Sequence, residues 1–341
     1  MKLTINNVEV TIKSGMTVLE AAQSAGIYIP TLCADPDLEP YGACRLCVVE
    51  IDNMRGLPTA CTTPAASGMV VRTETPAIHS VRRTALELLI ADHNADCLVC
   101  GKNQNCELQK IAAYMGINEL SFPKTTRKVA VDTSNPFFDV DRNKCILCAR
   151  CVRTCNEITC VGAIDLANRG YNMKVATFGD GLLFDSICQS CGECMVRCPV
   201  GALSLKNCVT PDSEVETTCP YCGTGCSMIL GVRDNRIVSV RGNRRGGANG
   251  GKLCVKGRFG ISEFVHSPER LTTPLIRKDD KFEKASWDEA LELIASKMAK
   301  YQPQEIGVVS SSRATNEANY VTQKFARAAL GVNNVDNCAR V

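Results

Sequence analysis

The sequence predicts an α+β chain built from several small modules in a row. The first observation is the cysteine content, 22 residues of 341. The second is an internal repeat, in which the four cysteines from Cys145 recur 43 positions later, from Cys188. The third is a change at Trp287, where the alternating helix and strand patterns of an α/β layer replace cysteine-rich loops. Modules held by metal ligation can be short, because the metal substitutes for part of a hydrophobic core.

Composition and charge exclude several classes of protein. The formal net charge of +3 is too small to indicate nucleic-acid binding, and the basic stretch at 241–245 is interpreted as a solvated loop. The N-terminal residues lack the charged start and apolar run of a secretory signal, and no apolar run is long enough to span a membrane. Cysteines spread over so long a chain favour metal ligation over a disulfide-stapled scaffold. We therefore expect a cytoplasmic protein without a membrane span.

The first 28 residues predict two strands followed by a helix. An Asn6-Asn7 turn separates the strands, and the second strand alternates apolar and polar residues. Thr17 and Glu20 form a capping box that begins the helix, and Gly26 ends it. This order of elements fits a small ubiquitin-like roll.

Further along, the pattern predicts a helix over 81–91, with Val81, Ala85, Leu88 and Leu89 on its apolar face. Residues 123–136 are interpreted as a connector between two prolines. The polar run TPDSEVETT is interpreted as a linker, and MILGVRDNRIVSV predicts strands. From Trp287 we expect a helix, a strand and a longer helix, which together begin an α/β domain.

The most specific pattern is C-x2-C-x2-C-x3-C, which occurs at 145–155 and again at 188–198. Three cysteines this close can reach three corners of one cubane, while the fourth crosses to the other cluster in two-cluster ferredoxins. Zinc, the alternative, normally uses separated C-x2-C pairs. The predicted [4Fe-4S] ligand sets are Cys145, Cys148, Cys151 and Cys198, and Cys188, Cys191, Cys194 and Cys155.

Three further sets have the spacing of cluster ligands. They are Cys33, Cys44, Cys47 and Cys61 for a [2Fe-2S] centre; His93, Cys97, Cys100 and Cys106; and Cys219, Cys222, Cys226 and Cys254 for another cubane. Spacing alone leaves zinc as an alternative for the first two sets. Lys256 is expected to lie close to the last set. The other histidines, His79 and His266, are interpreted as structural or surface residues.

Cys160, Cys208 and Cys338 have no partners at ligand spacing. We interpret all three as structural thiols, and we expect Cys338 to be buried.

The order of these modules resembles a known electron-input arm. About 200 N-terminal residues resemble the arm shared by the large iron-sulfur subunit of respiratory complex I, the iron-only hydrogenases and certain NAD(P)-linked formate dehydrogenases. In that arm a [2Fe-2S] domain precedes a [4Fe-4S] domain ligated by one histidine and three cysteines. The resemblance therefore implies that His93 is a ligand, and it favours iron-sulfur clusters over zinc at both N-terminal sites.

The C-terminal 125 or so residues resemble the start of the molybdenum or tungsten bis-pyranopterin oxidoreductases. The segments CPYCGTGC, LCVKGRFG, SWDEAL and TNEANYVTQKFARAALGVNNVDNCARV resemble those of formate dehydrogenases in particular. The resemblance implies that Lys256 lies between the cubane and a pterin and relays electrons. It also implies a selenocysteine or cysteine metal ligand directly after Val341, so that Cys338 is not the catalytic group. Because UGA encodes selenocysteine, we hypothesise a reading frame interrupted at a recoded stop codon.

The predicted domains follow the ligand sets. They are a [2Fe-2S] ferredoxin-like domain at 1–78, a histidine-ligated [4Fe-4S] domain at 79–120, a 2x[4Fe-4S] ferredoxin domain at 136–208, a β-rich [4Fe-4S] domain at 213–268, and the beginning of a molybdopterin-binding α/β domain at 269–341. The fold class is thus an α+β multidomain iron-sulfur protein.

The resemblance implies a formate dehydrogenase or CO2 reductase subunit. It would relay electrons through one [2Fe-2S] and four [4Fe-4S] clusters between a molybdenum or tungsten bis-pyranopterin guanine dinucleotide and a redox partner. No G-x-G-x-x-G fingerprint follows a strand, so a flavin or NAD(P) site would lie on another subunit. Ferredoxin or hydrogenase subunits are alternative partners. Alternative functions are an electron-transfer-only subunit, a complex I-like NADH dehydrogenase subunit and, less well matched, an iron-only hydrogenase.

Overall fold

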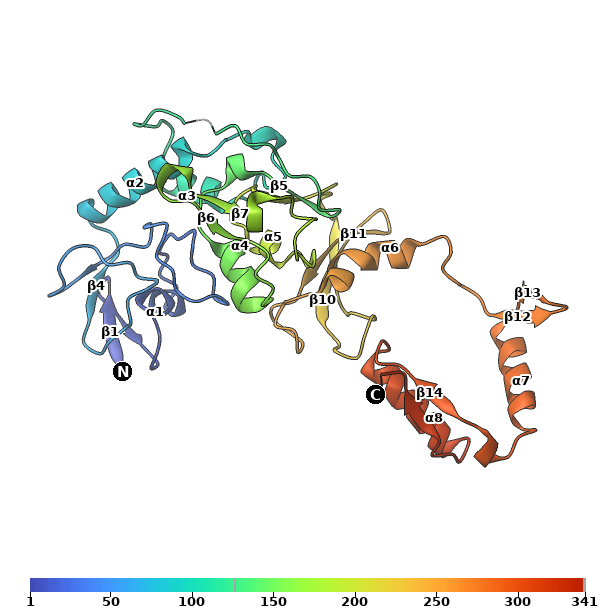
Figure 1. Ribbon diagram of the computed structural model, residues 1–341. Helices are drawn as coiled ribbons and strands as arrows, with labels where there is room; N and C mark the ends of the chain where they lie inside the picture. Colours follow the sequence, from blue (N-terminus) through green and yellow to red (C-terminus); the bar gives the residue numbers. More distant parts are fainter. Residues whose placement is uncertain (126, 340–341) are drawn as a thin grey trace. The chain divides into compact units, whose positions relative to one another are not determined.

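The computed structural model describes residues 1–125 and 127–339 (Figure 1). The chain divides into two compact units, Met1–Asn207 and Cys208–Val341. The predicted [2Fe-2S], histidine-ligated and ferredoxin modules all fall in the first unit. The predicted β-rich module and the beginning of the α/β layer fall in the second.

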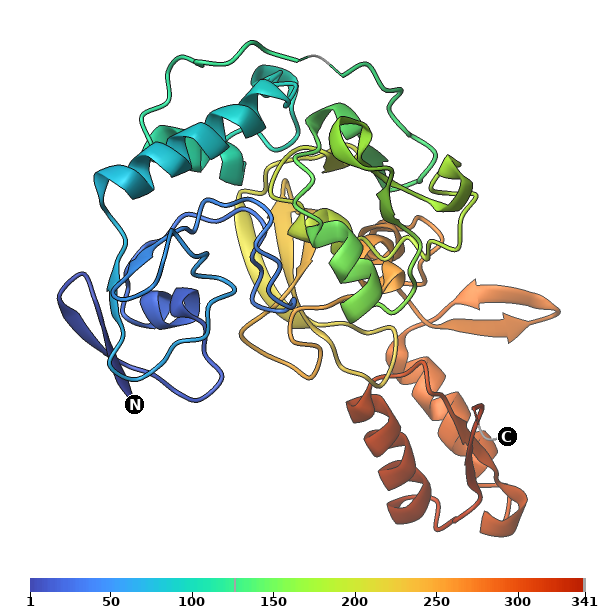
Figure 2. The same ribbon diagram turned by 60° about the vertical axis from the view of Figure 1, so that its left-hand side comes forward.

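The N-terminal module is a small mixed sheet packed on one helix (Figure 2). Its strands are β1 (Lys2–Ile5), β2 (Val8–Thr11), β3 (Glu50–Ile51) and β4 (Val70–Arg72), in the spatial order β2-β1-β4-β3. β1 pairs with β2 antiparallel and with β4 in parallel. Asn6 and Asn7 both have positive φ, as a tight hairpin turn of matching twist requires.

The helix of this module is α1 (Val18–Ser24), and it begins at the predicted capping box. The Thr17 side chain accepts a hydrogen bond from the Glu20 amide, and the Glu20 side chain accepts one from the Thr17 amide. The apolar face of α1 packs into the same buried core as the inner faces of the strands. The two strands and helix expected for this segment are therefore confirmed.

The second module begins with α2 (Pro76–Ala91), five residues earlier than predicted. Thr75 caps this helix and Pro76 occupies its first turn, a pattern that favours helix initiation. The predicted apolar face is wrong, because Val81 and Leu88 are exposed. The buried face carries two charged side chains, Arg82 and Glu87, among its apolar residues. A short helix, α3 (Glu107–Tyr114), follows the last cysteine of this module.

The ferredoxin module repeats its backbone as well as its cysteines. Its helices, α4 (Arg150–Arg153) and α5 (Glu193–Arg197), start 43 residues apart. Leu147 and Ala149 have positive φ, and so do Ser190 and Gly192, their counterparts 43 positions later. The strands form two antiparallel pairs, β5 (Phe138–Val140) with β8 (Leu203–Leu205), and β6 (Asp165–Ala167) with β7 (Lys174–Ala176). The internal repeat predicted from the sequence is thus present in the structure.

The second unit opens with an antiparallel sheet, in the order β11-β10-β9. Its strands are β9 (Ser213–Thr218), β10 (Ser227–Arg233) and β11 (Arg236–Gly242). The interpretation of TPDSEVETT as a linker was wrong, because most of it forms β9. The strand was not predicted because its exposed residues include carboxylates, which are typical of loops. One of them, Glu214, pairs across the sheet with Arg241 at 2.6 Å. The helix α6 (Ile261–His266) then packs near β11.

The remaining residues form a hairpin and a fragment of an α/β layer. The elements are β12 (Leu275–Lys278), β13 (Lys281–Lys284), α7 (Trp287–Met298), β14 (Val308–Ser310), α8 (Asn316–Ala328) and β15 (Val335–Asn337). β14 pairs in parallel with β15, so α8 is the crossover between them. The predicted helix, strand and helix are confirmed. In the described part of the chain no helix has the length and apolar character needed to cross a membrane.

Candidate functional site

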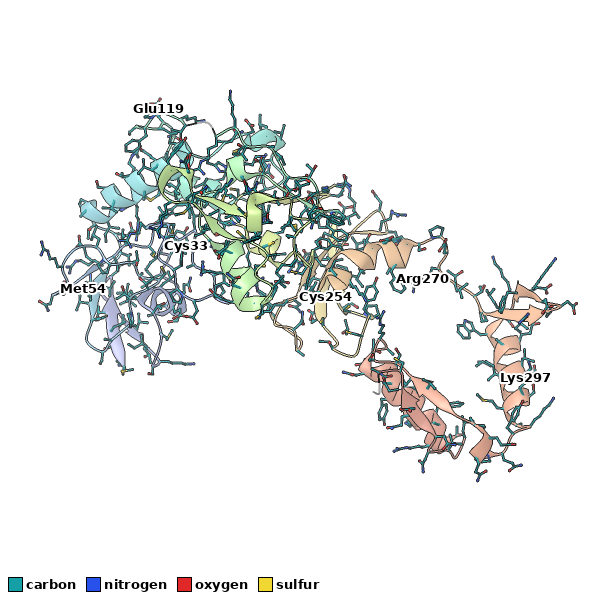
Figure 3. The ribbon with its side chains drawn as sticks, viewed as in Figure 1. Cys33, Met54, Glu119, Cys254, Arg270 and Lys297 are labelled. Atoms are coloured by element: carbon teal, nitrogen blue, oxygen red, sulfur yellow. The ribbon has the colours of Figure 1, made fainter. Side chains whose placement is uncertain are left out.

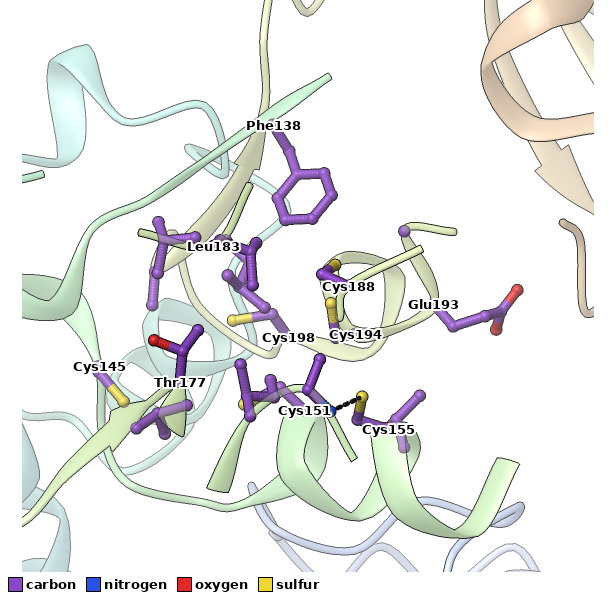
Figure 4. A pocket seen from close by; sticks show the side chains of 18 of the residues that line it. Phe138, Cys145, Cys151, Cys155, Thr177, Leu183, Cys188, Glu193, Cys194 and Cys198 are labelled. Atoms are coloured by element: carbon purple, nitrogen blue, oxygen red, sulfur yellow. Dashed lines mark hydrogen bonds between the residues drawn. The ribbon is translucent and has the colours of Figure 1, made fainter. Parts of the chain in front are cut away.

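The eight cysteines of the ferredoxin repeat line a single cavity. Figure 4 shows thiols from α4, α5 and their flanking loops gathered around it, while the carboxylate of Glu193 points away. Apolar side chains such as Phe138 and Leu183 line the rest of the wall. The sequence patterns at 145–155 and 188–198 therefore converge on one largely apolar space, as a pair of clusters requires.

The thiols of the two runs also act on one another's pKa. Burial raises the pKa of Cys145 to about 11, and nearby Cys198 adds to the rise. Burial likewise raises the pKa of Cys188, with additions from Cys191 and Cys155. Cys198 thus acts on Cys145, Cys148 and Cys151 of the other run, and Cys155 acts on Cys188 and Cys194. This is the arrangement predicted from two-cluster ferredoxins, although the ligand roles themselves stay predictions.

The raised thiol pKa values also fit a cationic occupant. Burial first, and then repulsion between neighbouring thiolates, raises the pKa of Cys145, Cys148, Cys151, Cys188 and Cys194. Iron bound by these cysteines would supply the positive charge that favours their thiolate forms, and its binding would release their protons. Among the described residues no group of three or more His, Cys, Asp or Glu is arranged to hold a single metal ion. Thiolates of a multi-iron cluster are instead spread over several irons.

Backbone amides point at several of these sulfur atoms. Leu147 N lies 3.4 Å from Cys145 Sγ, and Ser190 N lies 3.4 Å from Cys188 Sγ. Eight residues after Cys155, the amide nitrogen of Ala163 lies 3.3 Å from Cys155 Sγ (Figure 4). The positive φ of Leu147 and Ser190 turns their amides toward the sulfurs. Such hydrogen bonds stabilise the negative charge of a cluster and so raise its reduction potential.

The histidine set also lines one cavity. His93, Cys97, Cys100 and Cys106 all border it. His93 is only 8% exposed, and burial lowers its pKa, so its imidazole is neutral at pH 7. Its Nδ1 donates to the carbonyl oxygen of Lys144 at 2.9 Å, because a carbonyl can only accept. Nε2 is then the nitrogen with a free lone pair, the form in which histidine ligates metals.

Gly201 of the ferredoxin module closes this cavity from the other side. A Cβ built at Gly201 would lie 2.3 Å from Cys100 Sγ, closer than any real contact. Nothing in the sequence pattern singles out this glycine, which sits three residues after Cys198. The ferredoxin module therefore touches the histidine-ligated site directly, at a position where only glycine fits.

Replacing Gly201 by alanine is expected to displace Cys100 and to remove the cluster of the His93 set, about four iron atoms per chain. Iron analysis and low-temperature EPR of the reduced protein would measure the loss. Gly101→Ala is the matched control, because its Cβ would meet Ser204 at an ordinary 3.6 Å. Equal iron content in Gly201→Ala and Gly101→Ala would contradict the expectation.

The four cysteines of the N-terminal set are buried and contact one another. A hydrogen bond with Cys33, followed by burial, raises the pKa of Cys44. Cys61 interacts with both Cys33, which lowers its pKa, and Cys47, which raises it, and the net result is a pKa of about 11. Leu32 N also donates to Cys44 Sγ at 3.4 Å. The long first interval of this set thus still delivers all four thiols to one place.

The last set lies in the second unit, beside the sheet of β9, β10 and β11. Figure 3 marks Cys254, an exposed member, and Cys33 of the first unit. Burial raises the pKa of Cys219, and Cys254 and Cys222 add to the rise. The pKa of Cys222 is lowered, first by its hydrogen bonds with Thr224 and also by the charge of Lys256. The charge of Lys256 therefore reaches Cys222, while its role as an electron relay stays a prediction.

The three cysteines outside the sets are all exposed. The expectation that Cys338 is buried is thus wrong within the described residues: its thiol lies at the surface, 3.4 Å from Ser311 Oγ. Its hydrogen bond with Ser311 lowers its pKa. His79 pairs with Glu74 at 2.7 Å, and His266 Nε2 accepts a hydrogen bond from Ile237 N, so both have the structural roles expected. The predicted metal ligand after Val341 lies outside the described residues.

Sequence reasoning missed the buried arginines that surround the ligands. In the first unit they are Arg82, Arg150, Arg153 and Arg197, each less than one-tenth exposed. Arg150 forms a two-pronged ion pair with Glu107, the residue after Cys106, with distances of 2.7 and 2.9 Å. Arg82 donates to the carbonyl of Val48, the residue after Cys47. A signal for these arginines was present in the sequence, because Arg150, Arg153 and Arg197 lie between the cysteines of the ferredoxin repeat.

Family models match the chain from end to end in five consecutive segments. They are "2Fe-2S iron-sulfur cluster binding domain" at 1–76, "NADH-ubiquinone oxidoreductase-G iron-sulfur binding region" at 82–120, "NADH-quinone oxidoreductase subunit 3, ferredoxin-like domain" at 135–204, "Molybdopterin oxidoreductase Fe4S4 domain" at 212–266, and "Molybdopterin oxidoreductase" at 270–341. The predicted fold class, a series of iron-sulfur domains followed by the start of a molybdopterin oxidoreductase domain, is thereby confirmed.

Several curated proteins are similar over almost the whole chain. An NADH-quinone oxidoreductase subunit of Rhizobium meliloti is 38% identical over 100% of the chain. NADPH-Fe(3+) oxidoreductase subunit alpha of Geobacter sulfurreducens is 33% identical over 100% of it, and a "putative formate dehydrogenase" of Staphylococcus haemolyticus is 30% identical over 99%. The chain spans 39–40% of the length of these relatives.

Among the solved structures that are similar to the chain, one matches it over part of its length. It is a chain of an NAD+-reducing [NiFe]-hydrogenase in the H2-reduced state, with a TM-score of 0.57 and 35% identity. The match covers 60% of this chain and 87% of the hydrogenase chain.

Proposed function

Because the chain belongs to the NADH-quinone oxidoreductase G/molybdopterin oxidoreductase family, with its iron-sulfur domains, we propose that it relays electrons from formate. It is an electron-transfer oxidoreductase subunit of that family. In the proposal, the whole protein interconverts formate and CO2 at a molybdenum or tungsten bis-pyranopterin site. Electrons then pass through the Cys219 cubane and the ferredoxin clusters toward the His93 and Cys33 clusters.

The observation that carries the proposal is the convergence at the Cys219 set. The segment CPYCGTGC places Cys219, Cys222 and Cys226 together, and Lys256 lies close enough to lower the pKa of Cys222. We propose Lys256 as the relay between this cubane and the pterin. Proteins named "putative formate dehydrogenase" are among the relatives that match the chain through this segment.

The residues of the chain have defined tasks in this proposal. The pterin-bound metal, when present, supplies the two-electron chemistry on formate, while each cluster carries one electron at a time. The cysteines and His93 hold the clusters, and the amides at Cys145, Cys155 and Cys188 hold negative charge on their sulfurs. The neutral imidazole of His93 is oriented by the Lys144 carbonyl. We propose that a flavin or NAD(P)-binding iron-sulfur subunit, ferredoxin or a hydrogenase subunit accepts the electrons.

The test uses the whole protein, purified without oxygen from its native source. We expect formate to reduce a viologen dye, and elemental analysis to find molybdenum or tungsten together with about 18 iron atoms per chain, the sum of one [2Fe-2S] and four [4Fe-4S] clusters. The control is the same protein with NADH or NADPH as donor, which should reduce the dye only through an added partner subunit. A protein that contains molybdenum or tungsten and all of its clusters but gives no formate-dependent reduction would contradict the proposal.

A second candidate is an NAD(P)H-linked role without formate chemistry. The 38% identity to an NADH-quinone oxidoreductase subunit and the 33% identity to an NADPH-Fe(3+) oxidoreductase subunit favour it. An electron-transfer-only iron-sulfur subunit is a variant of this candidate. The NAD(P)H-linked role and the electron-transfer-only role both predict that the native complex reduces the dye with a nicotinamide donor and not with formate. The same experiment therefore separates them from the formate proposal.

A further inference from the structure

The loop after Cys33 is held by the ferredoxin module. Arg153 lies in the ferredoxin repeat, between Cys151 and Cys155, and is 8% exposed. Its guanidinium donates one hydrogen bond to the carbonyl oxygen of Cys33 and another to that of Glu39, both at 2.5 Å. A single side chain of one module thus bridges both ends of a loop in another.

The same loop is held from a second direction. The amide of Glu39 donates to Glu157 Oε2 at 2.9 Å, so the Glu39 residue contacts Arg153 through its carbonyl and Glu157 through its amide. Arg153 and Glu157 lie two residues before and two residues after Cys155. The ring of Tyr41 lies 5.1 Å from the Arg153 guanidinium carbon, which closes the end of the loop. These contacts tie the position of Cys33 to that of Cys155.

The contact at Cys33 is electrostatic as well as structural. Cys33 is a predicted ligand of the [2Fe-2S] centre, and reduction adds a negative charge to that cluster. A positive charge hydrogen-bonded to the ligand residue stabilises the reduced form. Arg72, on the surface of the same module, pairs instead with Glu50 and Asp52 at 3.3 and 2.6 Å, away from the cysteines.

We propose that Arg153 is a positioning residue for the [2Fe-2S] centre of the Cys33 set. It fixes the Cys33 loop against the ferredoxin module and raises the reduction potential of that centre. The inference rests on a cluster in the N-terminal module and not on the substrate of the whole protein. Its failure is therefore distinguishable from the failure of the formate proposal.

The test is a redox titration of the whole protein, followed by EPR at temperatures where the [2Fe-2S] signal is resolved from the faster-relaxing cubanes. In Arg153→Gln we expect the equilibrium constant for reduction of the [2Fe-2S] centre to fall about tenfold, because one unit charge is lost at an effective dielectric constant near 20. For a one-electron couple this is a shift of about 59 mV to lower potential. Arg153→Lys keeps the charge and should restore most of the potential.

Arg72→Gln is the matched control, since it removes a guanidinium from the same module without touching a ligand loop, and it should leave the potential unchanged. An unchanged potential in Arg153→Gln, or an equal shift in Arg72→Gln, would overturn the proposal. If the Arg153→Gln protein does not assemble the cluster, the proposal is tested with Arg153→Lys alone. A changed EPR line shape with a near-native potential in Arg153→Lys supports the positioning role. Lysine keeps the charge but lacks the guanidinium that donates to both carbonyl groups. Native line shape and potential would refute it.

Discussion

Replacing Cys198 by serine is expected to remove the cluster of Cys145, Cys148 and Cys151, although Cys198 belongs to the other run in the sequence. The structure brings Cys198 into the electrostatic field of Cys145 and Cys148, and burial raises the pKa of all three thiols. A serine hydroxyl remains protonated there and is a poor ligand for iron. The loss should amount to about four iron atoms of roughly 18 per chain, with the Cys188 set unaffected.

The measurement compares EPR spectra of reduced variants. Cys198→Ser should reproduce the spectrum of Cys145→Ser, and Cys155→Ser should reproduce that of Cys188→Ser. Cys160→Ser is the control, because Cys160 is exposed and outside the sets, and it should keep all of the iron. If Cys198→Ser instead resembles Cys188→Ser, each run holds its own cluster and the crossed assignment is wrong.

Replacing Arg197 by methionine is expected to destabilise the first unit by about 3–5 kcal/mol, the usual cost of removing one partner of a buried ion pair. Arg197 is 4% exposed and faces three carboxylates. Asp37 lies 2.8 Å away and Asp35 lies 3.8 Å away, while Glu193 pairs with Arg197 from within α5. Methionine fills much of the volume but leaves Glu193 and Asp35 buried without this cation.

Chemical denaturation of the anaerobic whole protein, followed through the visible absorbance of the clusters, would report the loss as a lower midpoint. Arg72→Met serves as the comparison, because that arginine pairs with carboxylates at the surface and its removal should not move the midpoint. Equal midpoints for Arg197→Met and Arg72→Met would show that the buried cation contributes nothing net. That outcome would place the first unit among proteins in which a buried ion pair is dispensable.

The sequence predicted the ligand sets because iron-sulfur ligation imposes short, fixed cysteine spacings that survive without any knowledge of the fold. The 43-residue displacement predicted the repeat for the same reason, and Leu147 and Ser190 now show it in the backbone as well. Binary patterning was less reliable. It missed β9, whose exposed face carries carboxylates, and it chose the wrong face of α2, whose buried face includes Arg82 and Glu87.

The wrong face of α2 and the missed buried arginines share a physical cause. Charged residues are assigned to the surface from sequence because an unpaired buried charge is costly. Arg82 and Arg153 are buried nonetheless, because carbonyl groups of the ligand loops accept their hydrogen bonds. The close approach of Gly201 to Cys100 is likewise invisible in the sequence, since it joins segments about a hundred residues apart. Contacts between modules, rather than the modules themselves, are what the sequence could not supply.

The hydrogen bond from Arg153 to Cys33 joins residues 120 positions apart. A ribosome adds about 5–20 residues each second, so the N-terminal module emerges roughly 6–24 s before the side chain that secures its loop. Through that interval the strands and α1 can fold from local contacts, but the Cys33 loop lacks its anchor. We expect this loop to be the last part of the N-terminal module to reach its native form during biosynthesis, and its cluster to be stably inserted only once the ferredoxin repeat has been translated.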